Sequence, residues 1–309
     1  MGREAAYALQ QILNLAQLAS FYAPLAVAFA LIHAITKRVF LSFGDFAMFG
    51  SFAAVYVCFG RLLQGDSDGI AALLALLAAI ACAAALGQTA ARHVFKPLME
   101  KSALAFMIAG IGFSISVEEL MRITTDSRDI WIPPLLAGQS FTVVEGSFPV
   151  RLTATNVFAF LVSTTALILF WGGLRLTRFG RNWQACSQNL QLAKLCGVNT
   201  HSVILRSFIV GTGLSAVSGW TSAIIYGGTN SSVGIMLGFK AMFAAVAGGF
   251  GNVKGAFYGA VFLSAVEVLW SATFGTTYRD VGVFTIIIIV LLLKPEGLVG
   301  TLNYRESEP

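Results

Sequence analysis

Long apolar stretches, separated by polar connections, dominate the chain. Most are about as long as the 20 or so residues that an α-helix needs to cross the hydrocarbon core of a bilayer. They lack the alternation of apolar and polar positions that a membrane β-strand requires. Because the last stretches are short or interrupted by glycine, the pattern predicts an all-α bundle of eight or nine transmembrane helices. The stretches are residues 9–35, 43–63, 69–90, 102–121, 153–174, 207–226, 236–250, 255–274 and 281–293.

Two of the polar connections are much longer than a simple turn requires. Residues 175–206 form a polar island that carries basic side chains and no Asp or Glu. Residues 123–152 form the other, in which Pro133 and Pro134 prevent a regular helix. Trp131 beside charged residues suits a short lid or a re-entrant piece at the membrane surface, and a passive connector is the alternative.

The middle of the polar island has the pattern of a helix. Residues 182–196 follow Gly180–Arg181, and Gly197 is a helix stop. A short amphipathic helix between two spans can lie on the membrane surface with its basic residues on lipid headgroups. It can also be the knob through which a permease contacts a motor protein, and composition leaves both interpretations open. The apolar side of this run would consist of Leu190, Ala193, Leu195 and Val198.

Composition and charge narrow the class of protein. The chain is 57% hydrophobic and 11% charged, which excludes an ordinary soluble domain and a disordered chain. We interpret the net charge of +5 as a topology signal rather than as a nucleic-acid site. The positive-inside rule places the N-terminus outside and the island and C-terminus in the cytoplasm, which requires nine crossings. Thirteen of the 20 Lys and Arg then lie on the cytoplasmic side: Lys37, Arg38, Arg92, Lys96, Lys101, Arg175, Arg178, Arg181, Lys194, Arg206, Lys254, Lys294 and Arg305.

The remaining general features are those of a single membrane domain, residues 1–309. The N-terminus shows no cleavable signal peptide and is expected to form the first span. If residues 236–250 only dip into the membrane, eight crossings remain. The four cysteines form no close metal-type pair, so we expect free thiols and no metal site. They are Cys58, Cys82, Cys186 and Cys196.

Charged residues inside the apolar stretches are candidates for function, because ionisable groups at membrane depth are costly. Lys240 and Glu267 lie deepest, and Asp45 lies near the start of the second stretch. They would line a translocation path or a gate, or they would serve packing, for example as a Lys240–Glu267 pair. Only one histidine, His33, falls within a span, so no proton relay is evident.

Small residues are concentrated between positions 244 and 260. Gly251, Gly255 and Gly259 recur every four residues, which would place them on one helix face and allow close helix contact. A tight turn is expected between Gly248 and Lys254. The spacing does not match a dinucleotide-binding loop. These glycines are therefore candidates for packing or for the translocation path.

No combination of residues predicts an enzyme. The chain has no evident Ser, His and Asp cluster, and it has no HExxH, CxxC or P-loop motif. We therefore expect no catalytic residues and no cofactor bound by this chain. If ATP drives transport, the ATPase is another polypeptide.

Five stretches, in this order, resemble the LivH-type permeases of ATP-binding-cassette (ABC) importers for branched-chain amino acids. The resemblance covers nearly the whole chain, and the polar island corresponds to the coupling region of that family. The stretches are residues 13–35, 126–139, 180–219, 226–256 and 278–300.

The resemblance implies a type II importer-like permease in the inner membrane. It implies a second, LivM-like permease, two cytoplasmic ATPase subunits that bind ATP and Mg²⁺, and a periplasmic substrate-binding protein. It also implies a cytoplasmic coupling helix at about residues 181–199, where Arg181, Ala185, Ala193 and Gly197 match the family pattern.

The chain departs from the family pattern at two places. Gln188 and Asn189 stand where the family commonly has an acidic pair, so neutral hydrogen bonds and shape would replace ion pairs there. In the second stretch, Phe40 and Phe43 replace polar family residues while Asp45 keeps the acid. If that stretch lines the path, the path is more apolar and would suit a bulkier solute.

The sequence thus predicts a permease that translocates branched-chain or other hydrophobic amino acids, or related small solutes. Three alternatives remain open. One is a secondary transporter driven by an ion gradient, and another is a membrane scaffold or sensor subunit. The third is a permease of the same family for urea, amides or aromatic acids.

Overall fold

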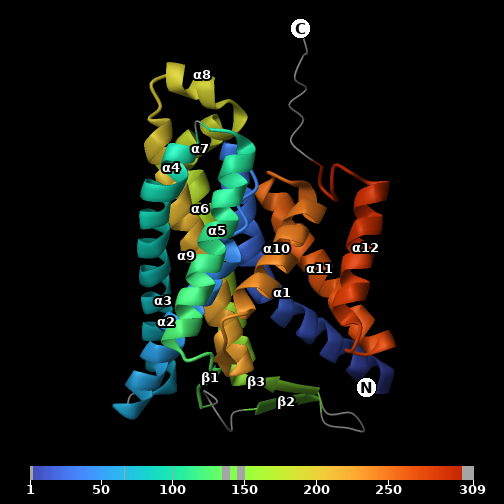
Figure 1. The fold of residues 1–309 in the computed structure, drawn as a ribbon. Helices are drawn as coiled ribbons and strands as arrows, with labels where there is room; N and C mark the ends of the chain where they lie inside the picture. The colour runs from blue at the N-terminus through green and yellow to red at the C-terminus, as the bar shows by residue number, and fades with distance from the viewer. Residues whose placement is uncertain (1–2, 66, 100, 134–139, 145–149, 301–309) are drawn as a thin grey trace.

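Long apolar helices that run back and forth between two faces make up the fold (Figure 1). The computed structural model describes residues 3–65, 67–99, 101–133, 140–144 and 150–300. The long helices are α1 (Arg3–Thr36), α2 (Phe43–Leu63), α3 (Asp68–Ala90), α5 (Ala103–Thr124), α6 (Ala154–Leu176), α9 (Thr200–Tyr226), α10 (Val233–Gly249), α11 (Val253–Phe274) and α12 (Arg279–Leu293). The short elements are the π-helix η1 (Ala91–Phe95), α4 (Lys96–Leu98), α7 (Arg178–Gln188), α8 (Leu190–Leu195), β1 (Ile130–Trp131), β2 (Ser140–Val144), β3 (Val150–Thr153) and β4 (Gly228–Thr229).

The helices agree with the predicted membrane bundle. Seven of them are long and apolar enough to cross a bilayer, among the residues that the structure describes. Helix α10 has 17 residues and spans only about 25 Å. It nevertheless connects the two faces, because it follows β4 at one end and, at the other, Ala247 accepts a hydrogen bond from Leu298 beyond α12. With the 15-residue α12, nine helices run between the faces in the described part of the chain.

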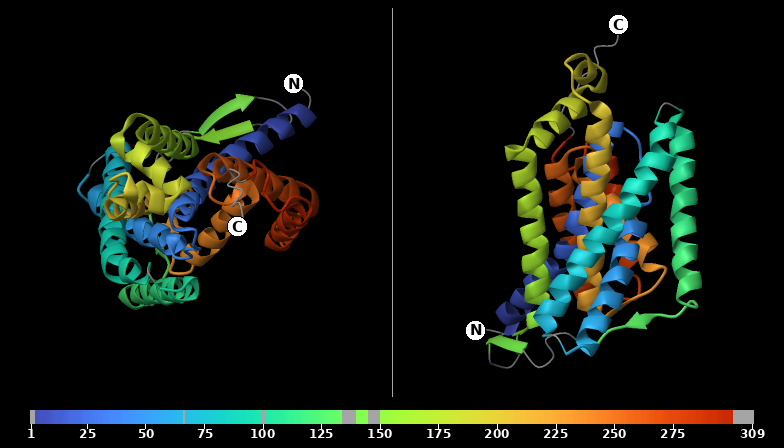
Figure 2. Two further views of the ribbon diagram at one scale, coloured as in Figure 1. Left: turned by 90° about the horizontal axis from the view of Figure 1, so that it is seen from above. Right: turned by 90° about the vertical axis from the view of Figure 1, so that its left-hand side faces the viewer.

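Helix α1 is the centre of the bundle. The most apolar part of this helix is 89% buried, against 17% for α5. Helices α9, α10 and α11 surround α1, whereas α5 and α12 lie at the edges (Figure 2). A displacement of α1 therefore affects most of the packed core, while α5 has much of its apolar surface free for lipid or another protein.

Glycines let α2 and α10 approach each other closely. A Cβ atom on Gly44 would lie 2.0 Å from the carbonyl oxygen of Gly234 and 2.7 Å from the Cα of Gly238. Gly234 and Gly238 are one helical turn apart, which is the small-xxx-small pattern of membrane helix contacts. The sequence-based prediction overlooked this pair, although the spacing was visible in the sequence.

The predicted glycine face between α10 and α11 is correct for two of its three members. A Cβ atom on Gly259 would lie 2.0 Å from the carbonyl oxygen of Ala244, and one on Gly255 would lie 2.5 Å from that of Gly248. The placement of Gly251 on this face is wrong. Gly251 has a φ of 91° and lies in the turn between the helices, because this left-handed backbone interrupts the helical run.

The long connection at residues 123–152 contains strands, which the sequence pattern did not predict. β1 pairs with β4 through Ile130–Thr229 and Trp131–Gly228, and β2 pairs with β3. These strands lie across one end of the bundle (Figure 1), so the described part of this connection does not re-enter the bundle. Pro134 lies outside the described residues.

The close contact between α2 and α10 can be tested with two identical substitutions in α2. Gly44→Ala places a methyl group against the backbone of α10, and overpacking of this kind costs about 1–3 kcal/mol. We expect its melting temperature in detergent to fall by several degrees. Gly60→Ala is the control, because no atom lies within 4 Å of its added Cβ. A helix interior favours Ala over Gly, so this variant should melt at or above the temperature of the parent protein. Equal melting temperatures for the two variants would contradict the contact.

Candidate functional site

The polar island folds into a helical projection at the face opposite the strands (Figure 1). The single run expected at residues 182–196 is wrong, because the chain breaks between α7 and α8. Asn189 has an extended backbone (φ −153°, ψ 113°), which ends α7. Its side-chain oxygen then accepts hydrogen bonds from the backbone N–H of Gln191 (2.9 Å) and Leu192 (3.0 Å), which caps α8. The predicted stop at Gly197 is confirmed, with φ of 81°.

The projection is attached to the central helix. The indole Nε1–H of buried Trp183 in α7 donates a hydrogen bond to the carbonyl oxygen of Leu31 in α1, at 3.2 Å. Gly180 lies so close to the end of α6 that a Cβ atom there would be 1.9 Å from the carbonyl oxygen of Leu174. A force on α7 therefore reaches α1 and α6 through direct contacts.

The predicted coupling residues fall into two groups. Arg181, Gln188 and Gly197 are exposed, whereas Ala193 is buried and Ala185 and Asn189 are half-buried. The exposed group offers one cation and one amide to a partner, and the small buried group allows the projection to pack on the bundle.

The apolar side expected for α8 is only partly correct. Leu195 is 83% exposed and does not pack inward with Ala193. Leu192, one turn before it, is 55% exposed. The break at Asn189 explains this, because it sets α8 at a new angle to α7. The projection thus presents two leucines that the sequence pattern did not single out as exposed.

Four charged side chains meet at the other face of the molecule. Lys240 Nζ lies 3.1 Å from Glu267 Oε1 and 2.7 Å from Asp280 Oδ1, and Arg279 Nε lies 3.1 Å from Glu267 Oε1. The hydroxyl of Tyr22 in α1 donates to Glu267 Oε2 at 2.9 Å. The Lys240–Glu267 pair named from the sequence therefore exists, as part of a larger charge network that joins α1, α10, α11 and α12.

The network carries no net charge, and two of its four side chains are partly exposed. Its two positive and two negative side chains balance, which is a condition for placing charges at membrane depth. Lys240 and Glu267 are buried, whereas the side chains of Arg279 and Asp280 are 35% and 32% exposed. Removing one partner of a buried pair costs about 3–5 kcal/mol, because the other charge is left without compensation.

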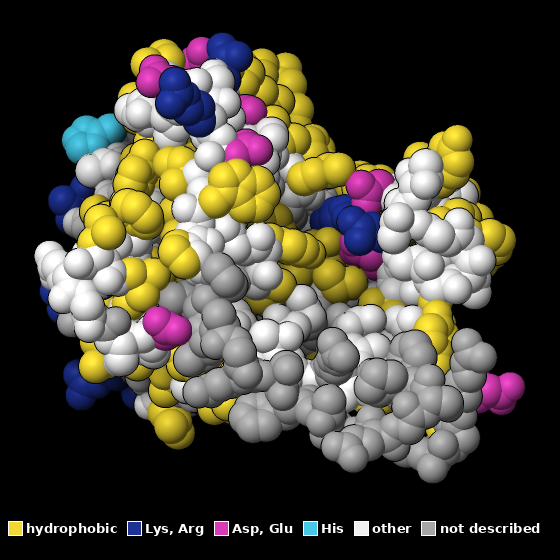
Figure 3. Space-filling model, turned by 90° about the horizontal axis from the view of Figure 1, so that it is seen from below, with side chains coloured by type: hydrophobic (Ala, Val, Ile, Leu, Met, Phe, Trp, Pro, Cys, Tyr) yellow, Lys and Arg dark blue, Asp and Glu magenta, His cyan; other side chains and the backbone are white. Residues whose placement is uncertain are grey.

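A pocket of about 280 Å³ opens at this network. It lies between α1, the end of α9, α10 and the start of α12, and Lys240, Arg279 and Asp280 line it. Viewed from the strand-bearing end, positive and negative side chains gather in a hollow of the surface (Figure 3). The structure therefore brings Lys240 to the wall of a pocket, with Glu267 buried behind it.

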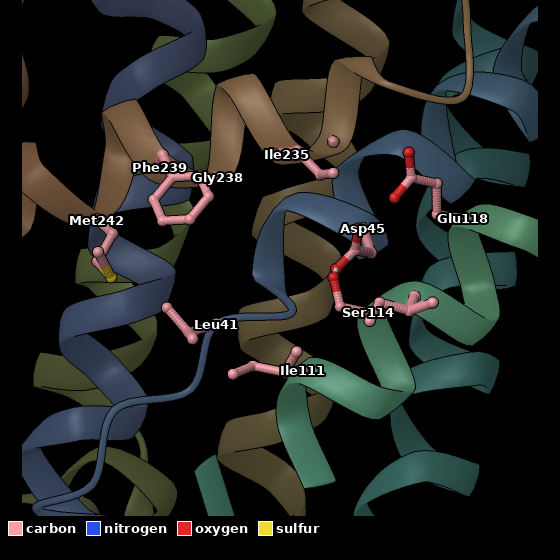
Figure 4. A pocket seen from close by; sticks show the side chains of 11 residues that line it. Leu41, Asp45, Ile111, Ser114, Glu118, Ile235, Gly238, Phe239 and Met242 are labelled. Carbon is pink, nitrogen blue, oxygen red and sulfur yellow. Dashed lines mark hydrogen bonds between the residues drawn. The ribbon is translucent and has the colours of Figure 1, made fainter. Parts of the chain in front are cut away.

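Asp45 lies at a second, smaller pocket between α2, α5 and α10. This pocket has a volume of about 160 Å³ and is mostly apolar. The Asp45 carboxylate accepts a hydrogen bond from the Ser114 hydroxyl. Figure 4 shows the two side chains facing each other, with Glu118 nearby. The other oxygen, Oδ1, is buried without a hydrogen-bond partner among the described residues.

Phe40 and Phe43, which replace polar family residues, lie inside the bundle. Both side chains are buried, and their ring centroids lie 4.9 Å apart. Phe40 also contacts Phe95 at 4.5 Å and Phe208 at 5.2 Å. Because aromatic rings gain by packing edge to face, the two residues stabilise the core in this structure.

Comparisons with known proteins agree with these features. A family model for the permease component of branched-chain amino acid transport systems matches residues 11–293. The high-affinity branched-chain amino acid transport system permease protein LivH of Salmonella typhimurium is 32% identical over 301 residues, which cover 97% of this chain and 98% of that protein. BraD, the corresponding protein of Pseudomonas aeruginosa, is 33% identical over 298 residues, covering 94% and 95%. The autoinducer 2 import system permease protein LsrC of Salmonella typhi is 35% identical over 167 residues, covering 52% and 46%.

The chain therefore belongs to the family of permease components of branched-chain amino acid transport systems. Together with its apolar helices, this makes it a multi-pass permease of the inner membrane.

The link between α1 and the charge network can be tested by removing one hydroxyl group. Tyr22→Phe deletes the hydrogen bond to Glu267, and a buried bond to a charged group contributes about 1.5–3 kcal/mol. We expect a lower melting temperature in detergent. Tyr226→Phe is the matched control, because Tyr226 lines the same pocket but is more than half exposed. If the control loses as much stability as Tyr22→Phe, the hydrogen bond is not the cause.

The native cysteines test the side on which the projection lies. Cys196 at the end of α8 is exposed, so a membrane-impermeant maleimide should label it in inside-out vesicles and not in right-side-out vesicles. Burial raises the pKa of the Cys186 thiol in α7, and the thiolate is the reactive form. Cys186 should therefore react much more slowly at neutral pH. Labelling of Cys196 from the outer side would place the projection outside.

Proposed function

We propose that this chain is one permease subunit of an ABC importer that carries branched-chain amino acids inward across the inner membrane. LivH and BraD, which it matches over nearly their whole lengths, are named as high-affinity branched-chain amino acid permeases. Separate ATPase subunits with bound ATP and Mg²⁺ supply the energy, a LivM-like permease completes the membrane part, and a periplasmic protein delivers the solute. This chain itself binds no cofactor and catalyses no reaction.

The observation that carries this proposal is the projection formed by α7 and α8. It extends from the face opposite the strands, and its exposed Leu192 and Leu195 are costly to leave in water. An ATPase surface with an apolar groove would cover them. Arg181 and Gln188 lie exposed on α7, the other helix of the projection.

The contact depends on shape more than on ion pairs. The side-chain oxygen of Asn189 already accepts two backbone N–H groups, so that oxygen has an internal role in starting α8. Gln188 is exposed and offers a neutral amide to the partner. The absence of an acidic pair at these two positions therefore leaves Arg181 as the exposed charge among the proposed coupling residues.

Transport then follows from a population shift between two arrangements of the permease. ATP binding draws the ATPases together and moves α7 and α8 with them. Trp183 transmits the movement to α1, whose neighbours include α9, α10 and α11. The glycine contacts at α10 allow the helices to slide at close distance, because no side chains interlock there.

The alternatives receive less support from the structure. A secondary transporter would need charged groups that are free to take up a coupling ion. The four charges of the network around Glu267 are paired with each other instead. A different solute within the same family is the second candidate, since LsrC, which matches about half of this chain, is named for autoinducer 2 import.

The proposed coupling can be tested with matched substitutions at two leucines. Leu195 in α8 and Leu293 at the end of α12 are 83% and 82% exposed. We expect Leu195→Ser to reduce the ATPase that co-purifies with the permease by about tenfold, because truncation of a central contact residue typically costs 1–2 kcal/mol or more. Leu293→Ser should leave it unchanged. Gel quantification of the purified complex measures both.

The same experiment tests the assembly as a whole. The parent chain should co-purify with two ATPase subunits and a second permease. Arg181→Glu should also weaken the contact with the ATPases. If Leu195→Ser retains its ATPase while Leu293→Ser loses it, the projection is not the coupling site. If no ATPase co-purifies with the parent chain, the importer assignment fails.

A further inference from the structure

We propose that the pocket at the charge network, called the outer pocket because it lies toward the end of the bundle opposite the projection, binds the zwitterionic head of an amino acid as it enters the permease. This inference rests on the proposed function, because it assigns a place to the solute of that importer. The pocket is the one between α1, α9, α10 and α12, with a volume of about 280 Å³. Such a volume accommodates a single amino acid.

The charges of the pocket match those of the ligand. An amino acid carries one carboxylate and one ammonium group, and the pocket offers cations in Lys240 and Arg279 and an anion in Asp280. The ligand carboxylate would take the place of Asp280 on Lys240, whose Nζ lies 2.7 Å from Asp280 Oδ1. The released Asp280 would then accept the ligand ammonium. Every charge has a partner before and after binding, so the exchange leaves none unpaired.

The rest of the pocket suits an apolar side chain. Phe21, Val233, Met236 and Leu237 line it together with the hydroxyl and amide groups of Ser222, Asn230 and Ser232. Met236 is 52% exposed, so the apolar wall is accessible from outside the core. An amino acid with a hydrocarbon side chain would bury that side chain here while its head binds the charged end.

A purely structural network would not need this geometry. Buried ion pairs add little stability compared with apolar packing, so a network that only joins helices has no reason to open into a pocket. Here about a third of the Arg279 and Asp280 side chains is exposed, and Figure 3 shows charges of both signs in a surface hollow. Glu267 stays buried and fixes the positions of Lys240 and Arg279 through ion pairs with both.

The second pocket lacks the same complementarity. Asp45 and Glu118 line it, and no Lys or Arg is among the described residues that form its wall. A ligand carboxylate would meet like charge there without a compensating cation. The outer pocket is therefore the one whose charges select a zwitterion over a simple anion or cation.

Photo-leucine, a diazirine analogue of leucine, tests the site directly. The assembled importer, with both permeases and both ATPases, is irradiated with this probe, and adducts are located by peptide mass spectrometry. We expect adducts on Phe21, Met236 or Leu237, and we expect excess leucine to suppress them. Asp280→Asn and Arg279→Gln should each lower adduct yield and leucine import at least tenfold.

Two further variants separate binding from folding. Met236→Trp fills the pocket from an exposed position, so it should abolish the adducts while the ATPases still co-purify in normal amounts. The paired change Glu119→Gln with Arg122→Gln removes an exposed ion pair on α5 and is the control, which should retain both adducts and import.

The outcomes distinguish this inference from the proposed function. Adducts outside the pocket, or normal import by Asp280→Asn and Met236→Trp, would overturn the pocket assignment. These results would leave the proposed function intact, provided that the parent complex imports leucine. If the parent complex imports no leucine at all, the proposed function itself fails.

Discussion

The constraint on which this structure depends is the high cost of leaving charges or backbone polar groups unpaired in hydrocarbon. Helices satisfy the backbone, so the chain is almost entirely helical between its two faces. Side chains satisfy the rest, and the four-charge network around Glu267 is the largest example. The same constraint pushes polar segments to the ends of the bundle. One end carries the charged hollow, and the other carries the projection formed by α7 and α8.

The two ends are connected through α1 and α10. Tyr22 of α1 holds Glu267 at one end, and Leu31 of the same helix accepts the hydrogen bond from Trp183 near the other. Helix α10 contributes Lys240 to the network and contacts α2 and α11 through glycines. A movement that starts at the projection can therefore reach the outer pocket along packed helices, as the proposed population shift between two arrangements requires.

Sequence reasoning predicted the spans well because the need for about 20 apolar residues leaves few choices. It also located the stop at Gly197, since a glycine after a helical run is a strong local signal. It failed where the outcome depends on contacts between distant segments. Nothing local in the sequence shows that Arg279 and Asp280 meet Lys240 and Glu267, because these residues come from three different helices. The buried aromatic packing of Phe40 and Phe43 and the break at Asn189 were missed for similar reasons.

The central claim is that this chain moves solute inward only when ATPase subunits drive it. Its most direct test is uptake of labelled leucine into liposomes that contain this chain with its partner permease, both ATPases and the binding protein. The account predicts uptake that requires ATP hydrolysis and stops when either ATPase is omitted. Uptake by the two permeases alone, driven by a proton or sodium gradient, would contradict it.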